Sequence, residues 1–303
     1  MDRIAEVVLG SPRGFCAGVV RAIDIVNLCL DKFGPPVYVK HQIVHNPYVV
    51  KELEKKGAIT VESVNDIPAG SVVVFSAHGS PPEDFESAKE RGLKIIDAVC
   101  PLVTRVHNEA KKYHNEGKRV LLVGHEGHQE VKGTMGQAPM TLISDSKDRL
   151  IPQWDSSTDV AIITQTTLSV RDTSEAIAEI QNTFSNATVR NDICYATTNR
   201  QDAVLTMSGK VDMVLVIGAE NSSNCNRLRE VAESLGVPAY LINDPLEIDA
   251  KWIKTSYRIG ITSGASTPEI LVDEVIKSLD PLKITVIPGI EENISFRIPE
   301  ELR

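Results

Sequence analysis

The sequence of 303 residues lacks the segments and motifs that mark several large classes of protein. No stretch approaches the ~18 unbroken apolar residues that a membrane-spanning helix needs. The opening residues, MDRIAEVVLGSPRG, do not contain the apolar core of a signal peptide. Acidic residues outnumber basic ones, and the net charge of -9 argues against a general nucleic-acid-binding protein. We therefore expect a cytoplasmic protein with neither a membrane nor a nucleic acid as partner.

Common nucleotide and cysteine motifs are also missing. The sequence contains neither GxGxxG nor a P-loop, so these nucleotide-cofactor sites are not predicted. It contains no CxxC, and an odd number of cysteines in a cytoplasmic chain makes a disulfide framework unexpected. If the cysteines bind a metal, the fold must bring together residues that are far apart in sequence. The five cysteines are Cys16, Cys29, Cys100, Cys194 and Cys225.

The segments that are present indicate an α/β protein. Short β-branched runs such as SVVVFSA, RVLLVGH, DVAIITQ, MVLVIGA and RIGITSGA alternate with amphipathic helical patterns. This alternation is typical of mainly parallel sheets covered by helices. Ligands of such sheets bind beyond the carboxyl ends of the strands, which is where this sequence places its His, Ser, Thr and Cys residues.

A weak internal repeat appears when three cysteines are aligned. The strings FCAGVVRAIDIV, VCPLVTRVHNEA and ICYATTNRQDAV each contain an apolar residue, a cysteine and a predicted helix start. An arginine follows five or six residues after each cysteine, and the spacing of the strings matches small α/β units. We predict three similar domains, 14–98, 99–192 and 193–285. The N-terminal segment 1–13 is expected to complete the third domain, and 286–303 to form a C-terminal tail.

The cysteines of this repeat are candidate metal ligands. Cys29 lies at helical spacing among Ile, Val and Leu and is interpreted as a packing residue. Cys16, Cys100 and Cys194 stand at predicted helix N-termini, where the helix dipole favours a thiolate. Three thiolates would need a cation, and iron–sulfur clusters and zinc are the groups that suit sulfur ligands. Three ligands would leave one coordination position open, and spacing does not separate a [4Fe–4S] cluster from zinc.

Histidines follow several of the predicted strands. His45 lies in IVHNPYVV, His78 in FSAHGSPPE, and His125 and His128 in GHEGHQE. The helical HExxH zinc motif is absent and glycines interrupt the helix, so we favour ligand binding over zinc binding at these residues. Glu130, two residues after His128, is the nearest candidate proton donor.

Hydroxyl and amide side chains occupy the remaining predicted strand ends. Those in GAENSSNCNRL precede a helical stretch, where hydroxyls and free helix N–H groups can bind an anion without a lysine. TSGASTPEI and TQTTLSV place further hydroxyls in the same position, so the sequence predicts a phosphate or diphosphate ligand. The candidate residues are Thr166, Thr167, Ser222, Ser223, Asn224 and Ser266.

Taken in order, these strings resemble the motif series of the 4-hydroxy-3-methylbut-2-enyl diphosphate reductases, the LytB/IspH family of the non-mevalonate isoprenoid pathway. The resemblance extends from about residue 9 to about residue 273. It is carried by GFCAGV, VHNPYVV, SAHGS, CPLVTRVH, GHEGHQEVKGTMGQ, TQTTLSV, CYATTNRQ, NSSNCNRL and SGASTP.

The resemblance implies three α/β domains arranged pseudo-threefold around a central [4Fe–4S] cluster with Cys16, Cys100 and Cys194 as ligands. It implies reduction of 4-hydroxy-3-methylbut-2-enyl diphosphate to isopentenyl and dimethylallyl diphosphate. The substrate hydroxyl would bind the open iron, and an external ferredoxin or flavodoxin would supply two electrons. Glu130 would relay protons, with Thr166 beside it near the substrate hydroxyl. The diphosphate would be bound by His45, His78, His128, Ser222, Ser223, Asn224 and Ser266.

The chain departs from the family pattern at three positions. Gln129 and Lys132 stand where the family often has Pro and Glu, and Cys225 replaces a serine. We expect Cys225 to be a neutral replacement, the alternative being an oxidisable thiol near the site. Two other functions are compatible with parts of the sequence: a zinc hydrolase of a phosphorylated substrate, and a non-catalytic anion-binding α/β protein. The second has no need of three cysteines at helix starts.

Overall fold

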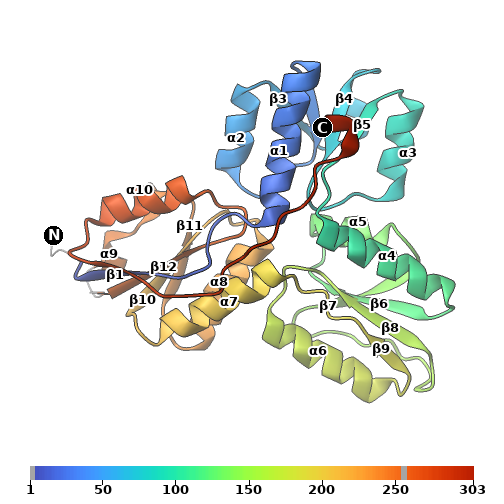
Figure 1. Ribbon diagram of the computed structural model, residues 1–303. Coiled ribbons are helices and arrows are strands. Elements are labelled where there is room, and N and C mark those ends of the chain that lie inside the picture. Colours follow the sequence, from blue (N-terminus) through green and yellow to red (C-terminus); the bar gives the residue numbers. More distant parts are fainter. Residues whose placement is uncertain (1–3, 254–257) are drawn as a thin grey trace. The chain divides into compact units, whose positions relative to one another are not determined.

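A computed structural model describes residues 4–253 and 258–303 of the chain (Figure 1). The chain divides into two compact units. The first comprises Met1–Ala17, His45–Val49 and Tyr195–Ile294, and the second comprises Gly18–Val44, Val50–Cys194 and Ser295–Arg303. Residues 1–3 of the predicted N-terminal segment and 254–257 of the predicted third domain lie outside the described residues. The boundaries of the three predicted domains stay predictions.

The first unit is built on one parallel five-stranded sheet in the order β11-β10-β12-β1-β13. The N-terminal strand lies inside this sheet, because β1 pairs with β12 on one side and with β13 on the other. Its strands are β1 (Glu6–Leu9), β10 (Met213–Ile217), β11 (Ala239–Ile242), β12 (Arg258–Ser263) and β13 (Ile284–Val286). Its helices are α7 (Tyr195–Ser208), α8 (Ser223–Ser234), α9 (Ala250–Ile253), α10 (Glu269–Leu279) and the short η2 (Pro245–Glu247).

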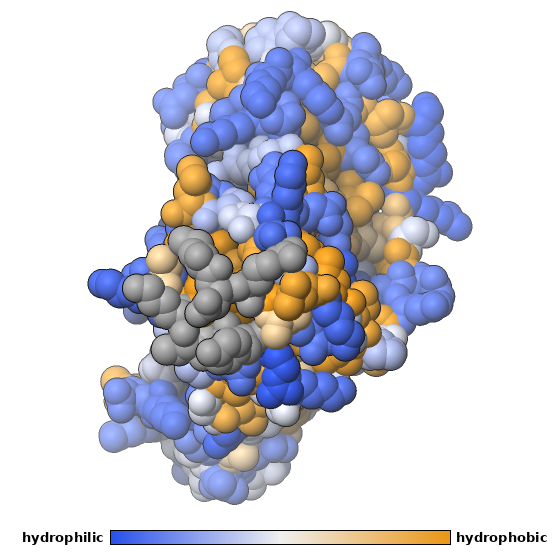
Figure 2. All heavy atoms as spheres, turned by 90° about the vertical axis from the view of Figure 1, so that its left-hand side faces the viewer, coloured by the Kyte–Doolittle hydropathy of each residue, from blue (hydrophilic) through white to orange (hydrophobic). Residues whose placement is uncertain are grey.

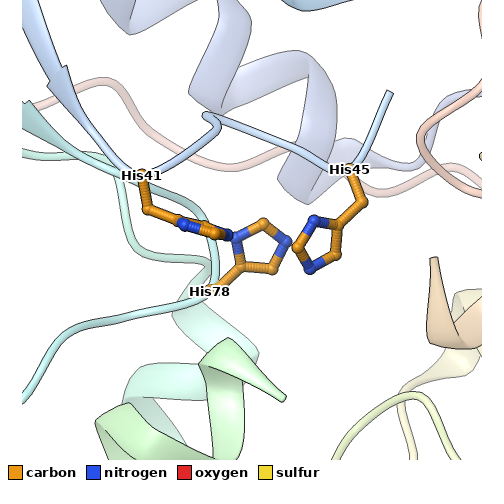
Figure 3. Close-up of side chains that lie close together, drawn as sticks. All are labelled: His41, His45 and His78. Atoms are coloured by element: carbon orange, nitrogen blue, oxygen red, sulfur yellow. The ribbon is translucent and has the colours of Figure 1, made fainter. Parts of the chain in front are cut away.

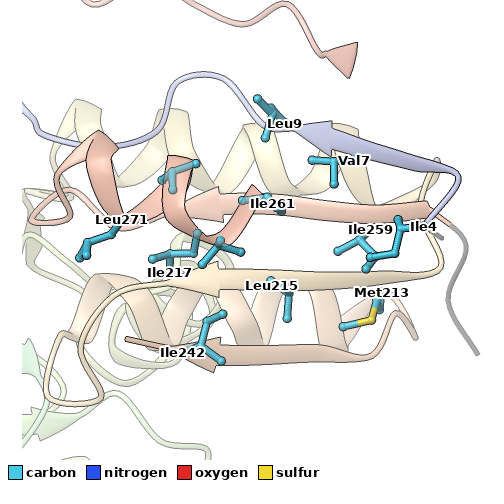
Figure 4. Packing of buried hydrophobic residues seen from close by; sticks show 12 residues of the cluster. Ile4, Val7, Leu9, Met213, Leu215, Ile217, Ile242, Ile259, Ile261 and Leu271 are labelled. Atoms are coloured by element: carbon cyan, nitrogen blue, oxygen red, sulfur yellow. The ribbon is translucent and has the colours of Figure 1, made fainter. Parts of the chain in front are cut away.

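Both faces of this sheet are covered. On one face Leu215 and Ile261 belong to a cluster with Leu271 of α10, as the close-up shows (Figure 4). On the other face Val214 packs with Val204 of α7, in a cluster that also includes residues of α8. The inner strand β10 is buried at every residue. Continuous apolar strands are what a parallel sheet covered on both faces requires.

The second unit contains two parallel four-stranded sheets, ordered β3-β2-β4-β5 and β7-β6-β8-β9. The first consists of β2 (Val37–Lys40), β3 (Ala58–Val61), β4 (Val72–Phe75) and β5 (Lys94–Asp97). The second consists of β6 (Arg119–Gly124), β7 (Met140–Ser144), β8 (Val160–Thr164) and β9 (Ala187–Val189). The helices are α1 (Ala17–Phe33), α2 (Pro47–Lys55), α3 (Pro82–Glu90), α4 (Pro101–Asn115), α5 (Gln129–Met135) and α6 (Val170–Thr183), with η1 (Val64–Asp66) and η3 (Glu300–Leu302). The first residue of α1 and the first three of α2 belong to the first unit.

The prediction of an α/β protein with three similar, parallel sheets is confirmed. Hydrophilic side chains dominate the molecular face in Figure 2, with smaller apolar areas between them. Within the described residues, none of the helices combines the length and apolar character needed to traverse a bilayer.

Candidate functional site

The same backbone setting recurs at three different sheets, and it is occupied by Cys16, Cys100 and Cys194. Each stands immediately before a helix, respectively α1, α4 and α7. Each N–H donates a hydrogen bond to the carbonyl two residues beyond the end of a strand: β12, β4 and β8. The acceptors are Ala265 at 3.1 Å, Ala77 at 3.0 Å and Thr166 at 3.1 Å. The repeat visible in the sequence therefore corresponds to a repeated anchor at the carboxyl end of each sheet.

The side chains of these three cysteines are partly exposed and are not in disulfides. A thiol at the start of a helix faces the positive end of the helix dipole, which favours the thiolate that metals bind. The donor set of three thiols in matched settings fits an iron–sulfur cluster, and three sulfur ligands would also suit zinc. The prediction that these residues are metal ligands stays a prediction.

The other two cysteines are fully buried. Burial raises the pKa of Cys29 to about 11. Burial also raises the pKa of Cys225, whose side chain interacts with Ser222 and Thr267. A fully buried thiol with a raised pKa is a poor nucleophile, so Cys225 fits the expected neutral replacement of a serine better than an oxidisable thiol.

The structure brings Glu130 and Thr166 together, although 36 residues separate them in sequence. Oε1 of Glu130 accepts the Thr166 N–H at 2.7 Å, and Oε2 accepts the Thr166 hydroxyl at 2.9 Å. The side chain is only 3% exposed. Burial raises the pKa of Glu130 to about 7, against the opposing effect of the two bonds from Thr166. A carboxyl that titrates near neutrality is suited to both donating and accepting a proton.

His128 is joined to the same site by the backbone. It caps the N-terminus of α5, and its Nδ1 accepts the Glu130 N–H at 3.2 Å. Burial, with smaller effects from other charges, lowers the pKa of His128 to about 4, so the imidazole is neutral at pH 7. Because Nδ1 is an acceptor, the proton of the neutral ring lies on Nε2 and is a hydrogen-bond donor.

His78 lies between two other imidazoles of the second unit. Its ring centroid is 6.1 Å from that of His128 and 5.7 Å from that of His41, both edge to face. Figure 3 shows the rings of His41 and His78; His45, also labelled there, belongs to the first unit. Sequence reasoning missed His41, which directly follows β2 and pairs with Glu62 at 2.9 Å. Its position just after a strand was the available signal.

His107 is a second residue that the sequence reasoning did not single out. It is buried in α4, and a methyl group placed on Gly79 would collide with its ring. Burial lowers the pKa of His107 to about 4, and its Nε2 has no hydrogen-bond partner in the described part of the chain. His107 therefore supports the turn after His78 as an uncharged packing group.

Gln165 is a third such residue, and it organises the loop around Thr167. It is 1% exposed, and its amide donates to the Thr167 hydroxyl at 2.9 Å. Its Oε1 accepts the N–H of His125 at 2.9 Å. The side chain of His125 is 59% exposed and lies 3.5 Å from Asp145. Of the two histidines in GHEGHQE, only His128 is thus partly buried and hydrogen-bonded to Glu130.

The predicted anion-binding residues of the first unit gather around the start of α8. Ser222 caps this helix, its hydroxyl accepting the Cys225 N–H at 3.4 Å. The Ser266 hydroxyl donates to the His45 carbonyl at 3.0 Å, and the Asn221 amide lies 3.4 Å from Nδ1 of the His45 ring. These contacts place His45 and Ser266 side by side.

Asn224, in the first turn of α8, is the strongest indication of a ligand in the first unit. It is only 4% exposed, and neither its Oδ1 nor its Nδ2 has a hydrogen-bond partner among residues 4–253 and 258–303. A buried amide without partners costs about 1–3 kcal/mol for each unmet group. A polar ligand that bonds to this amide would recover that cost.

Comparison with known proteins relates the whole chain to one family. The sequence matches the LytB protein family over residues 7–280. It is 52% identical to 4-hydroxy-3-methylbut-2-enyl diphosphate reductase 2 of Bradyrhizobium diazoefficiens, over 98% of this chain and 99% of that one. It is 49% identical to the 4-hydroxy-3-methylbut-2-enyl diphosphate reductase of Pseudomonas putida, over 98% of both chains. The structure of E-1-hydroxy-2-methyl-but-2-enyl-4-diphosphate reductase from Plasmodium falciparum aligns with a TM-score of 0.92 at 36% identity, covering 99% of this chain and 97% of that chain.

Proposed function

Because the chain belongs to the LytB protein family, we propose that it reduces 4-hydroxy-3-methylbut-2-enyl diphosphate to isopentenyl diphosphate and dimethylallyl diphosphate. This would be the last step of the non-mevalonate isoprenoid pathway. The observation that carries the proposal is the matched setting of Cys16, Cys100 and Cys194, each anchored to the carboxyl end of a different sheet. A simple anion-binding protein does not call for three cysteines in matched settings at helix starts.

Cys16, Cys100 and Cys194 are the residues that would hold a [4Fe–4S] cluster. When bound, such a cluster would supply electrons and, having only three protein ligands, a coordination position open to the substrate. The electrons would come from ferredoxin or flavodoxin, since the sequence contains neither of the two common nucleotide-binding motifs.

Glu130 would deliver the proton on which loss of the hydroxyl depends. Hydroxide is a poor leaving group at neutral pH, whereas a protonated hydroxyl leaves as water. With a pKa of about 7, Glu130 is partly protonated at neutral pH, and Thr166 is hydrogen-bonded to its carboxyl. The overall change consumes two electrons and two protons: one proton leaves in water and the other is added to carbon. Addition at either end of the allyl fragment gives one of the two products.

The diphosphate would be bound by imidazole, hydroxyl and amide donors. In the second unit these are the side chains of His78, His128 and Thr167. In the first unit they are His45, Ser222, Ser223, Asn224 and Ser266. The neutral state of His128 and the unmet amide of Asn224 support this assignment, because both offer N–H groups to an anion.

The test is anaerobic purification followed by iron and sulfide analysis, spectroscopy and assay with a reduced electron donor. We expect about four iron and four sulfide per chain, in keeping with a [4Fe–4S] cluster, and formation of both diphosphate products. Cys100→Ser should lose the cluster and the activity together. Zinc in place of iron, or a Cys100→Ser variant with unchanged activity, would overturn the proposal.

A further inference from the structure

The loop of residues 10–16, which carries Cys16, is fastened at several points within the first unit. The Gly14 N–H donates to the Ser263 hydroxyl at 2.9 Å. The Cys16 N–H donates to Ala265, and the next N–H, of Ala17, donates to the Tyr195 hydroxyl at 3.3 Å. The carbonyl of Gly14 accepts its hydrogen bonds from a side chain instead.

That partner is the guanidinium of Arg200, whose side chain is fully buried. Nη2 and Nε of Arg200 both donate to the Gly14 carbonyl, at 2.7 and 3.2 Å. Nη1 donates to the Ala196 carbonyl at 2.9 Å, within the same helix, α7. Helix α7 therefore holds the Cys16 loop on both sides of the cysteine, at Gly14 through Arg200 and at Ala17 through Tyr195.

The charge of Arg200 is compensated by Glu292, far along the chain. The Glu292 carboxylate accepts from Nη1 at 3.0 Å and from Nη2 at 3.3 Å, and Asn199 donates to it at 3.1 Å. The Glu292 side chain is only 12% exposed. A buried guanidinium without such a partner would be strongly destabilised. Arg200 can hold Gly14 in this geometry only while Glu292 is in place.

The segment that carries Glu292 also contacts the loop directly. The Ile287 N–H donates to the Leu9 carbonyl at 2.9 Å, just before the loop begins. A methyl group on Gly289 would collide with the carbonyl oxygen of Ser11. Only glycine permits this approach of two backbones. Residues 287–292 thus run beside the loop and end at the carboxylate that neutralises Arg200.

We propose that Arg200 and Glu292 are positioning residues for Cys16, and that segment 287–292 supports the metal site by holding the Cys16 loop in place. The inference rests on the proposed function, because it takes Cys16 as a cluster ligand. The guanidinium fixes the carbonyl two residues before Cys16, and the carboxylate fixes the guanidinium. Loosening the pair frees the Cys16 loop while the sheets beneath it stay folded.

The test follows each cysteine separately. Iron-loaded protein is treated anaerobically with a ferrous chelator and iodoacetamide, and alkylation of every cysteine is followed by peptide mass spectrometry. In Glu292→Gln, which removes the charge and keeps the shape, we expect iron release and Cys16 alkylation about five-fold faster than in the wild type, the effect of losing about 1 kcal/mol of charge-assisted bonding. Glu292→Asp, which keeps the charge, should recover part of the difference.

Two controls separate positioning from general loss of structure. Glu291→Gln removes the adjacent, exposed carboxylate and should behave as the wild type. Cys225, fully buried in the same unit, reports unfolding and should stay unlabelled while Cys16 reacts. If Glu292→Gln does not fold, Asn199→Ala removes only one bond to the same carboxylate and should produce a smaller change in the same direction. Labelling of Cys225 together with Cys16 would overturn the inference.

The same alkylation is repeated on metal-free chains, where faster reaction of Cys16 in Glu292→Gln supports the positioning role independently of the cluster. Wild-type protein that binds no iron would overturn the proposed function alone. Unchanged Cys16 rates in both experiments, in protein that does bind iron, would overturn the positioning role alone.

Discussion

Replacing Glu130 by glutamine should stabilise the folded chain at alkaline pH while abolishing turnover. The pKa of Glu130 is about 7 in the folded protein, compared with its ordinary value of 4.5. Between pH 4.5 and 7 the unfolded chain gives up a proton that the folded chain retains, so the wild type loses stability as pH rises. The loss amounts to about 3 kcal/mol once both states are ionised.

Glutamine mimics the protonated carboxyl in this site. Its carbonyl can accept the Thr166 N–H in place of Oε1, and its amide can donate to the Thr166 oxygen that now bonds to Oε2. Because glutamine does not ionise, the variant escapes the loss at high pH. We expect nearly equal stability of the two proteins at pH 5, and a variant more stable by up to about 3 kcal/mol at pH 8.

The measurement is urea denaturation from pH 5 to pH 8, under anaerobic conditions and at matched iron content. Glu126→Gln, which removes an exposed carboxylate four residues earlier, controls for the change in net charge. If the stability difference between Glu130→Gln and the wild type stays constant across this range, the buried, proton-retaining carboxyl is refuted. Activity retained by Glu130→Gln would refute its role as proton donor.

Further predictions concern other groups of the site and its supports. Thr166→Val removes one of two bonds that lower the pKa of Glu130, so the alkaline limb of the pH–rate profile of kcat, where the proton donor loses its proton, should move up by roughly one pH unit; an unmoved profile would contradict the assigned pair. Burial lowers the pKa of His107 to about 4, so stability should fall as pH drops below 6.5, and His107→Gln should lessen that fall in acid denaturation by up to about 3 kcal/mol. Gly289→Ala should lower the Tm by several degrees through the clash with Ser11, and an unchanged Tm would show that the segment can move aside.

Much of the architecture follows from local patterns. Apolar β-branched runs followed by helical periodicity indicate parallel sheets, and the three cysteine strings point to a setting that recurs in all three sheets. These signals are readable because strand burial and helix starts leave their mark within a dozen residues. The order of short motifs also predicts the family, and the match to the LytB protein family confirms that prediction.

The partners of individual side chains cannot be predicted from these local patterns. Nothing in the sequence around Arg200 indicates that its charge is met by Glu292, which lies within the segment 286–303 predicted to form a C-terminal tail. Gln165 and His107 likewise gain their roles only from residues that folding brings beside them. Such pairs depend on tertiary packing over long sequence separations, which periodicity does not encode.

The three cysteine anchors allow the connecting loops to differ in length. The segment that connects the preceding strand to the cysteine is longest before Cys16 and shortest before Cys100. Each cysteine nevertheless donates its N–H to the carbonyl two residues beyond the end of a neighbouring strand. Loop length is therefore open to variation by evolution or design, whereas strand register is not. A one-residue slip of β12, β4 or β8 would move the anchor and displace one cysteine, so the accuracy of the proposed metal site depends on the register of the sheets.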